Sequence, residues 1–100
     1  MLQDPWVVAF ESARVEPASF RHREHLRVAW CYLRELPVEV ALERYLRHLR
    51  RLTVALGAAQ KFDAELTRRY FQRLATAMLA SPGLGFEALL EAHAALTSRP

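Results

Sequence analysis

The sequence predicts an all-α fold, a single-domain bundle of four main helices preceded by a short N-terminal helix. Leucine, alanine, arginine and glutamate dominate the chain, and apolar residues recur at the three- and four-residue steps of an amphipathic helix. Prolines and glycines fall between these segments, where they would end helices. No repeat or long linker interrupts the 100 residues, of which 52% are hydrophobic, so we expect one helical domain over residues 1–100.

The first expected helix is short and covers the segment "PWVVAFESA". Asp4 is a good N-cap, because its carboxylate can accept a free backbone N–H, and Pro5 suits the first turn. Trp6 and Phe10 are four residues apart, so they share one side of this helix. The segment "VEPASF" then breaks the helical pattern.

Two longer helices follow, with Pro37 between them. We expect the first from about Ser19, a plausible N-cap, to Leu36, and the second from Val38 to Leu56. The tight connection favours an antiparallel pair. Their buried stripes are formed by apolar residues at helical spacing, namely Leu26, Ala29, Trp30, Leu33 and Leu36 in one, and Leu42, Tyr45, Leu46, Leu49, Leu52 and Leu56 in the other.

Gly57 is the expected stop of that helix, and a fourth helix should begin near Phe62 and end at "SPGLG". Its inward side chains are Leu66, Tyr70, Leu74, Ala77 and Met78. The segment "FEALLEAHAALTS" predicts a last helix, which either caps the bundle or docks on a partner subunit of a homo-oligomer. If successive helices are antiparallel, the second and fourth helices run parallel and begin at the same end of the bundle.

His22 and His25 are the residues that point most directly to a function. At about 100° per residue, His22 lies above Leu26 and Ala29 on the apolar face, and His25 lies about 60° to one side. The spacing His-x-x-His lets two side chains on adjacent turns bind one metal ion, with a third ligand from another helix. The alternative is structural: one histidine is exposed at the helix start and the other bonds a backbone carbonyl.

Asp63 and Glu11 are the acidic candidates for the same site. Asp63, at the start of the fourth helix, would come near His22 if the second and fourth helices are parallel, and Glu11 ends the first helix. His22, His25, Asp63 and Glu11 are therefore predicted metal ligands for zinc or iron(II), with Thr67 and Tyr70 in support. Without a metal, His22 and Asp63 could act as a base and its orienting acid. The alternative for Asp63 is a plain N-cap.

Two other classes of function stay open. The chain could be a non-catalytic structural or interaction protein, with a homodimer as its expected form, whose histidines only satisfy hydrogen bonds in the core. Nucleic-acid binding through "ERYLRHLRRL" is disfavoured, because an acid is interspersed with the arginines and one aromatic residue is too few for a single-strand binder. His48 and His93 are expected to be surface residues, and an apolar pocket around the paired histidines would suit a small organic ligand.

Composition and the N-terminal segment predict a cytoplasmic protein. The net charge of +3 is mild, and basicity alone is weak evidence for nucleic-acid binding. Cys31 is the single cysteine and lies in the apolar run "AWCYL", which favours a buried, inert thiol in a reducing compartment. The segment "MLQDPWVVAF" has an acid where a signal peptide carries positive charge, and no apolar run is long enough for a membrane span.

The segments "FRHREHLRVAWCYLREL" and "KFDAELT" resemble a family of small, uncharacterised bacterial all-helical proteins. The family pattern is an aromatic residue, x-His-x-x-His-Leu, an Ala-Trp-x-Tyr-Leu segment and a later Tyr-His-Glu-Thr segment. The resemblance covers Phe10 to about Leu79 and is carried by Phe20, His22, His25, Leu26, Trp30, Tyr32 and Leu33. In the later segment Phe62, Asp63 and Ala64 replace the family's Tyr, His and Glu, and Thr67 is retained. The resemblance implies a polar site built from the second and fourth helices, with Glu11 in the family's Phe-Glu pair.

Overall fold

The protein is all-α, as predicted. A computed structural model describes residues 2–97, and in that range it has five α-helices, two short 3-10 helices and no strand. In chain order the elements are α1 (Pro5–Glu11), α2 (His22–Glu35), α3 (Val38–Ala55), η1 (Ala59–Lys61), α4 (Ala64–Ala80), α5 (Phe86–Ala92) and η2 (Ala94–Thr97). None of the helices in this range is both long enough and apolar enough to cross a membrane.

Several helix ends lie where the sequence predicts them. Asp4 caps α1 by accepting a hydrogen bond from the backbone nitrogen of Trp6 at 3.0 Å, and Pro5 is the first helical residue. α3 begins directly after Pro37. Gly57 follows α3 with a φ of +68°, a left-handed conformation that glycine adopts without a steric penalty.

Other helix ends differ from the predictions. Ser19 is not the N-cap of α2, which begins at His22 after Arg21; the backbone nitrogen of Arg21 donates to Glu24 Oε1 at 2.8 Å. Ser19 lies in a preceding turn, bonded to the carbonyl of Glu16. α4 begins at Ala64, two residues later than expected, because Asp63 is its N-cap. The last predicted helix divides at His93 into α5 and η2, and its predicted end at Ser98 lies outside the described residues.

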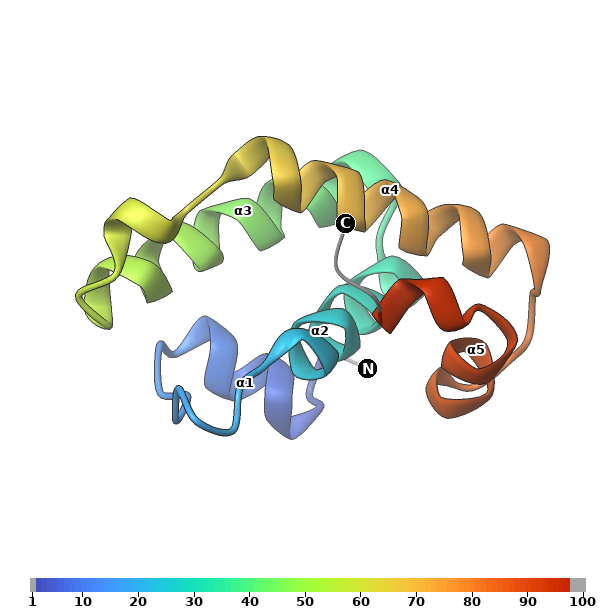
Figure 1. Cartoon of the computed structure of the whole chain (residues 1–100), viewed down its shortest axis with the longest axis horizontal. Coiled ribbons are helices and arrows are strands. Elements are labelled where there is room, and N and C mark those ends of the chain that lie inside the picture. The colour runs from blue at the N-terminus through green and yellow to red at the C-terminus, as the bar shows by residue number, and fades with distance from the viewer. Residues whose placement is uncertain (1, 98–100) are drawn as a thin grey trace.

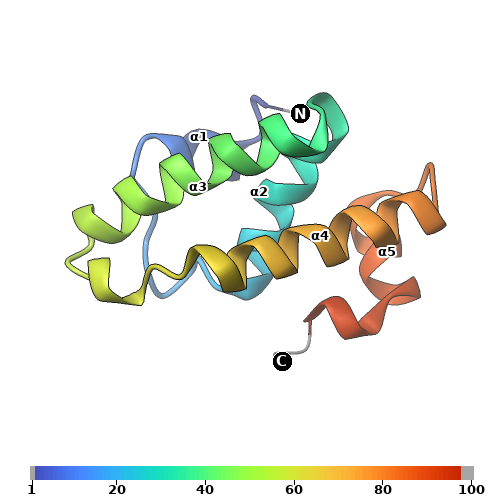
Figure 2. The same cartoon turned by 90° about the horizontal axis from the view of Figure 1, so that it is seen from above.

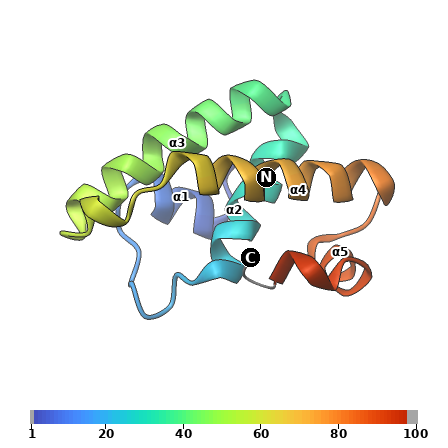
Figure 3. The same cartoon turned by 45° about the horizontal axis from the view of Figure 1, so that its top comes forward.

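The helices form two layers, and α2 lies across the other long helices. α3 and α4 run side by side in opposite directions in one layer, with α1, α2 and α5 beneath them (Figures 1 and 2). α2 is steeply inclined to both α3 and α4 (Figure 3), so the predicted antiparallel pairing of α2 with α3, and the parallel pairing of α2 with α4, are wrong. The cause is the link of Leu36 and Pro37, whose ψ angles of 151° and 150° make the chain turn a corner.

α2 is the central helix of the core and packs against α1, α3 and α4. Five consecutive residues, Val28 to Tyr32, are buried, and five residues span more than a full helical turn. The helix is therefore covered all round in this segment, whereas the sequence predicts one buried stripe. Cys31 has no exposed surface, and burial raises the pKa of its thiol, in agreement with the predicted inert role.

Candidate functional site

A cavity of about 330 Å³ lies where the first turns of α2 and α4 meet α3 and η1. His22, His25 and Asp63 all line it, so the structure brings together three of the four predicted ligands around one space. Thr67 and Tyr70, which were expected to support the site, line it as well. The rest of the wall is mainly apolar and consists of Leu26, Ala29, Tyr45, Leu49, Thr53, Ala58, Lys61, Phe62, Leu66 and Phe71.

His22 is the first residue of α2 and is half-buried. Its Nε2 lies 2.8 Å from the carbonyl oxygen of Leu96 in η2. A carbonyl oxygen can only accept, so Nε2 donates, and in the neutral ring Nδ1 is an acceptor. The ring packs against that of Tyr70, with 4.8 Å between centroids. The carbonyl of Leu96 thus fixes the orientation of His22. Helix periodicity alone could not show this contact.

His25 lies one turn further along α2, with Nδ1 2.9 Å from the hydroxyl of Tyr45 and its ring 4.3 Å from that of Phe20. Burial, and next the neighbouring His22, lower the pKa of His25 from 6.5 to about 4. The ring is therefore neutral at pH 7. Burial also raises the pKa of Tyr45, so its hydroxyl stays protonated.

One nitrogen of each imidazole is left over. Bonds between residues 2–97 use Nε2 of His22 and Nδ1 of His25, and they leave Nδ1 of His22 and Nε2 of His25 without a partner. A polar group that stays unpaired when it loses water costs about 1 to 3 kcal/mol, so such nitrogens are suited to meet a ligand or solvent. Both rings line the cavity, which gives it hydrogen-bonding groups on an otherwise apolar wall.

Asp63 acts as an N-cap, which was the alternative interpretation of this residue. Its Oδ1 accepts a hydrogen bond from the backbone nitrogen of Leu66 at 3.0 Å, and the side chain is exposed. Between residues 2 and 97 no hydrogen bond or ion pair joins it to His22, so the predicted base and orienting acid are not in contact, and the Leu96 carbonyl takes the orienting place. That range also contains no group of three or more His, Cys, Asp or Glu side chains arranged to hold a metal ion.

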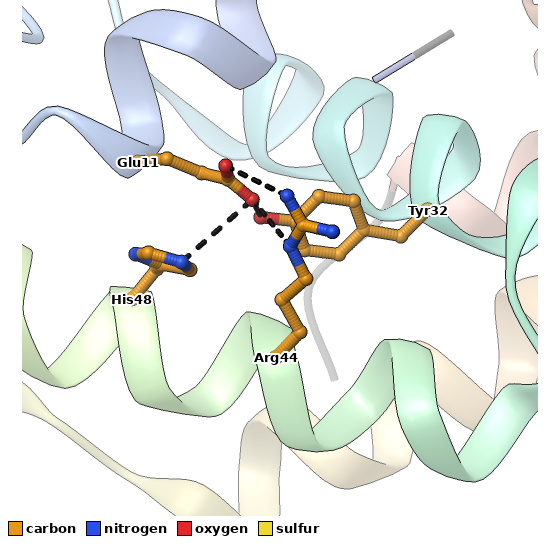
Figure 4. Close-up of polar contacts among 4 residues, drawn as sticks. All are labelled: Glu11, Tyr32, Arg44 and His48. Carbon is orange, nitrogen blue, oxygen red and sulfur yellow. Dashed lines mark hydrogen bonds and ion pairs between the residues drawn. The ribbon is translucent and has the colours of Figure 1, made fainter.

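Glu11 lies elsewhere, in a second polar site that we call the Glu11 cluster: Glu11, Tyr32, Arg44 and His48 (Figure 4). Arg44 donates to both carboxylate oxygens, from Nε at 2.7 Å and from Nη2 at 2.9 Å, and the Tyr32 hydroxyl donates to Oε2. His48 Nε2 lies 3.7 Å from the same oxygen. The cluster joins α1 to α2 and α3, and Glu11 is not on the cavity wall.

The electrostatics of the Glu11 cluster are those of a satisfied ion pair. Burial by itself would raise the pKa of Glu11, but the hydrogen bonds from Arg44 and Tyr32 outweigh it, and the pKa lies below its ordinary value. The bond to Glu11 raises the pKa of Arg44. Burial lowers the pKa of His48, although Glu11 acts in the opposite direction. The Glu11 carboxylate is thus paired with the Arg44 guanidinium and the Tyr32 hydroxyl.

His48 and Arg44 also correct two expectations about α3. His48 was predicted to be a surface residue, but only 13% of its side chain is exposed, and its Nδ1 is buried without a hydrogen-bond partner. Arg44 turns inward to Glu11, and Arg50 lies over the ring of Phe62 at 4.9 Å, so the arginines of α3 do not form one free cationic row. The four-residue spacing of Arg44 and His48 places them on one side of α3, so the sequence could have indicated that they share a site.

His93 is also more than a surface residue. It is half-buried at the end of α5, and its Nε2 lies 2.9 Å from the hydroxyl of Ser81. This contact joins the C-terminal end of α5 to the C-terminal end of α4 and lies apart from the cavity. His93 therefore has a local structural role.

A functional assignment for this chain rests mainly on the arrangement of these residues. The resemblance to a bacterial helical family is carried by residues that the structure places in α2, at the N-terminus of α4 and in the core. No family model, curated protein or solved structure matches the chain, so membership of that family stays a prediction.

Proposed function

We propose that this protein binds a small organic molecule in the cavity between α2, α3 and α4, with the imidazoles of His22 and His25 as its polar contacts. One observation carries the proposal: two imidazoles, each with a ring nitrogen unused by residues 2–97, line an otherwise mainly apolar cavity. The volume of about 330 Å³ is near the lower end of the range for ligand pockets, roughly 300 to 1,000 Å³.

The cavity differs from the packing expected of a plain core. Protein interiors have few voids larger than a water molecule, whereas this space has a volume of about 330 Å³. Tyr45 and Leu96 hold the two rings in place, which reduces the ordering required when a ligand binds. These features favour a preformed pocket over a packing defect.

The same geometry supports a second, chemical role for the imidazoles. A neutral imidazole can take a proton from a bound molecule, and both rings are held within reach of the same space. His22 donates to a backbone carbonyl, which also resembles the outer contact of a metal-bound histidine. Since no third ligand is gathered within residues 2–97, we place binding of an organic molecule before a zinc or iron(II) centre.

A ligand screen on two matched variants tests the binding role. Leu66 lines the cavity and is 38% exposed, so Leu66→Trp adds bulk there with a small cost in stability. Leu79→Trp makes the same change on the same helix at an 82% exposed position outside the cavity. In a fragment screen by NMR, we expect ligands that shift the cavity residues of the native protein to bind Leu79→Trp equally and Leu66→Trp about 10-fold more weakly. Equal binding to both variants would contradict the proposal.

The metal role is tested on protein made without an affinity tag. Less than about 0.1 zinc or iron per chain, together with zinc binding that the His22→Ala variant does not weaken, would exclude a metal centre built on His22. Stoichiometric metal that is lost in both His22→Ala and His25→Ala would replace the organic-ligand proposal. His93→Ala is the control, because that histidine lies outside the cavity.

A further inference from the structure

A second cavity shares part of its wall with the first, and charged side chains line both. It has a volume of about 550 Å³ and shares His22, His25, Lys61, Leu66 and Tyr70 with the inner cavity. Its other wall residues are Pro17, Phe20 and Arg21. The two spaces therefore meet at these five shared residues, which we call the rim.

The charges around the two cavities are unequal. Lys61 lines both and Arg21 lines the outer one, while Asp63 is the single carboxylate of residues 2–97 that lines either. The Asp63 carboxylate is used as the N-cap of α4, and within residues 2–97 no ion pair joins it, or any other acid, to Lys61. Lys61 is also the single lysine of the chain, where every other cationic side chain apart from histidine is an arginine. Among the described residues, Lys61 is thus a cation without a carboxylate partner.

Tyr70 adds a hydrogen-bond donor at the same rim. It lies on α4, is half-buried and lines both cavities, with its ring against that of His22. No bond to its hydroxyl occurs within residues 2–97. Lys61 and Tyr70 thus line the same two cavities. An ammonium group and a hydroxyl can together recognise a carboxylate, since both donate to its oxygens and one carries the opposite charge.

Resting on the proposed function, we propose that the ligand is a compact organic anion with an apolar body and one carboxylate. The body lies in the inner cavity against Leu26, Leu49 and Phe71. The carboxylate lies at the rim, where Lys61 and Tyr70 donate to it and Arg21 contributes long-range attraction. The wall of the inner cavity is mainly apolar, so a second charged group placed there would lose water at a cost in free energy.

Three probes with the same body and different charge test this. They are 3-phenylpropanoate, 3-phenylpropanamide and 3-phenylpropylamine, each titrated into ¹⁵N-labelled protein at pH 7.5, where they are an anion, a neutral amide and a cation. We expect the anion to bind at least about 10-fold more tightly than the amide, and the amine most weakly. The resonances that shift should belong to residues that line the two cavities. Added salt should weaken the anion alone.

Variants of Lys61 and Tyr70 test whether the preference for the anion depends on the rim. Lys61→Gln should weaken the anion about 10-fold and the amide less than about 2-fold, and Tyr70→Phe should weaken the anion about 5-fold. Arg68→Gln removes the same charge from an exposed position of α4 outside both cavities and should change the anion affinity less than about 2-fold. Lys61 is exposed, so its replacement should leave the fold intact.

The outcomes separate the two proposals. Equal affinity for the three probes, or a Lys61→Gln variant that weakens the anion and the amide alike, would overturn selection of an anion and leave the binding pocket standing. If none of the probes binds at 10 mM, or if the shifted resonances lie outside the cavities, the proposed pocket itself fails and the anion class fails with it.

Discussion

Two regions place polar side chains against the apolar core, the Glu11 cluster and the cavity with His22 and His25. In the Glu11 cluster one carboxylate has three donors from two other helices, and its charge is balanced by Arg44. In the cavity each imidazole has one hydrogen-bond partner within residues 2–97, and both rings line open space. A polar group whose bonds are complete stabilises the fold, whereas one with capacity left is available to a ligand.

Removing Glu11 should have the largest effect on stability. Glu11→Ala leaves the Arg44 guanidinium and the Tyr32 hydroxyl without their acceptor, and we expect the free energy of unfolding to fall by about 2 to 3 kcal/mol. Urea denaturation measures the change. Glu43→Ala, an exposed acid in the middle of α3, should change it by less than about 0.5 kcal/mol. Similar losses in the two variants would remove the contrast between the regions.

The second effect is a pH dependence from His25, whose pKa is about 4 in the folded protein against an ordinary value of 6.5. Above pH 6.5 the ring is neutral in both states. Between pH 6.5 and about 4 the unfolded chain binds a proton that the folded protein does not, so stability falls as the pH falls, by about 2 kcal/mol at pH 5. His25→Gln should remove this slope. Parallel curves of stability against pH for the two proteins would contradict the burial of this ring.

The next effect concerns the bond between His22 and the chain end. His22→Ala removes the donor to the Leu96 carbonyl and should lower the free energy of unfolding by about 1 kcal/mol. Hydrogen exchange should show faster opening of η2 and little change in α3. Protection that is lost evenly over the whole chain would show that His22 supports the core and not the chain end.

The smallest effect tests whether Asp63 acts only as an N-cap or also through its negative charge. Asp63→Ala should cost about 1 kcal/mol, while Asp63→Asn should change the free energy of unfolding by less than about 0.5 kcal/mol, because asparagine caps a helix about as well. Thermal unfolding at pH 7 is sufficient for the comparison. An Asp63→Asn variant as unstable as Asp63→Ala would mean that the charge at this position has a role beyond capping.

Most of the secondary structure could be predicted from the sequence, because caps, prolines and helical periodicity are local signals. The crossing of α2 could not. Pro37 shows that the helix ends, but the direction in which the chain then leaves depends on how the helices pack on both sides of the segment Val28 to Tyr32. The unbroken apolar run in this segment was the available sign that the helix is covered all round. The expectation that the starts of α2 and α4 meet was useful, although the parallel arrangement behind it was wrong.

The candidate site could be predicted in part. The position of His22 and His25 on the apolar face of α2 follows from spacing alone, and both line the cavity. The partners of these rings, Leu96 and Tyr45, are 74 and 20 residues away in the chain, and no local pattern identifies them. Glu11 was assigned to the wrong neighbourhood for the same reason, because its contact with Arg44 spans 33 residues.

Because Cys31 is completely buried, the reaction of its thiol with a thiol reagent measures conformational opening of the protein. The thiol lies on the most enclosed helix and is the single cysteine of the chain, so a thiol reagent can modify the molecule only after α2 separates from its neighbours. The rate of modification therefore follows cooperative unfolding with no engineered label. Ligands of the cavity should slow this rate in proportion to their occupancy, which makes the native cysteine a binding assay that needs no knowledge of the ligand in advance.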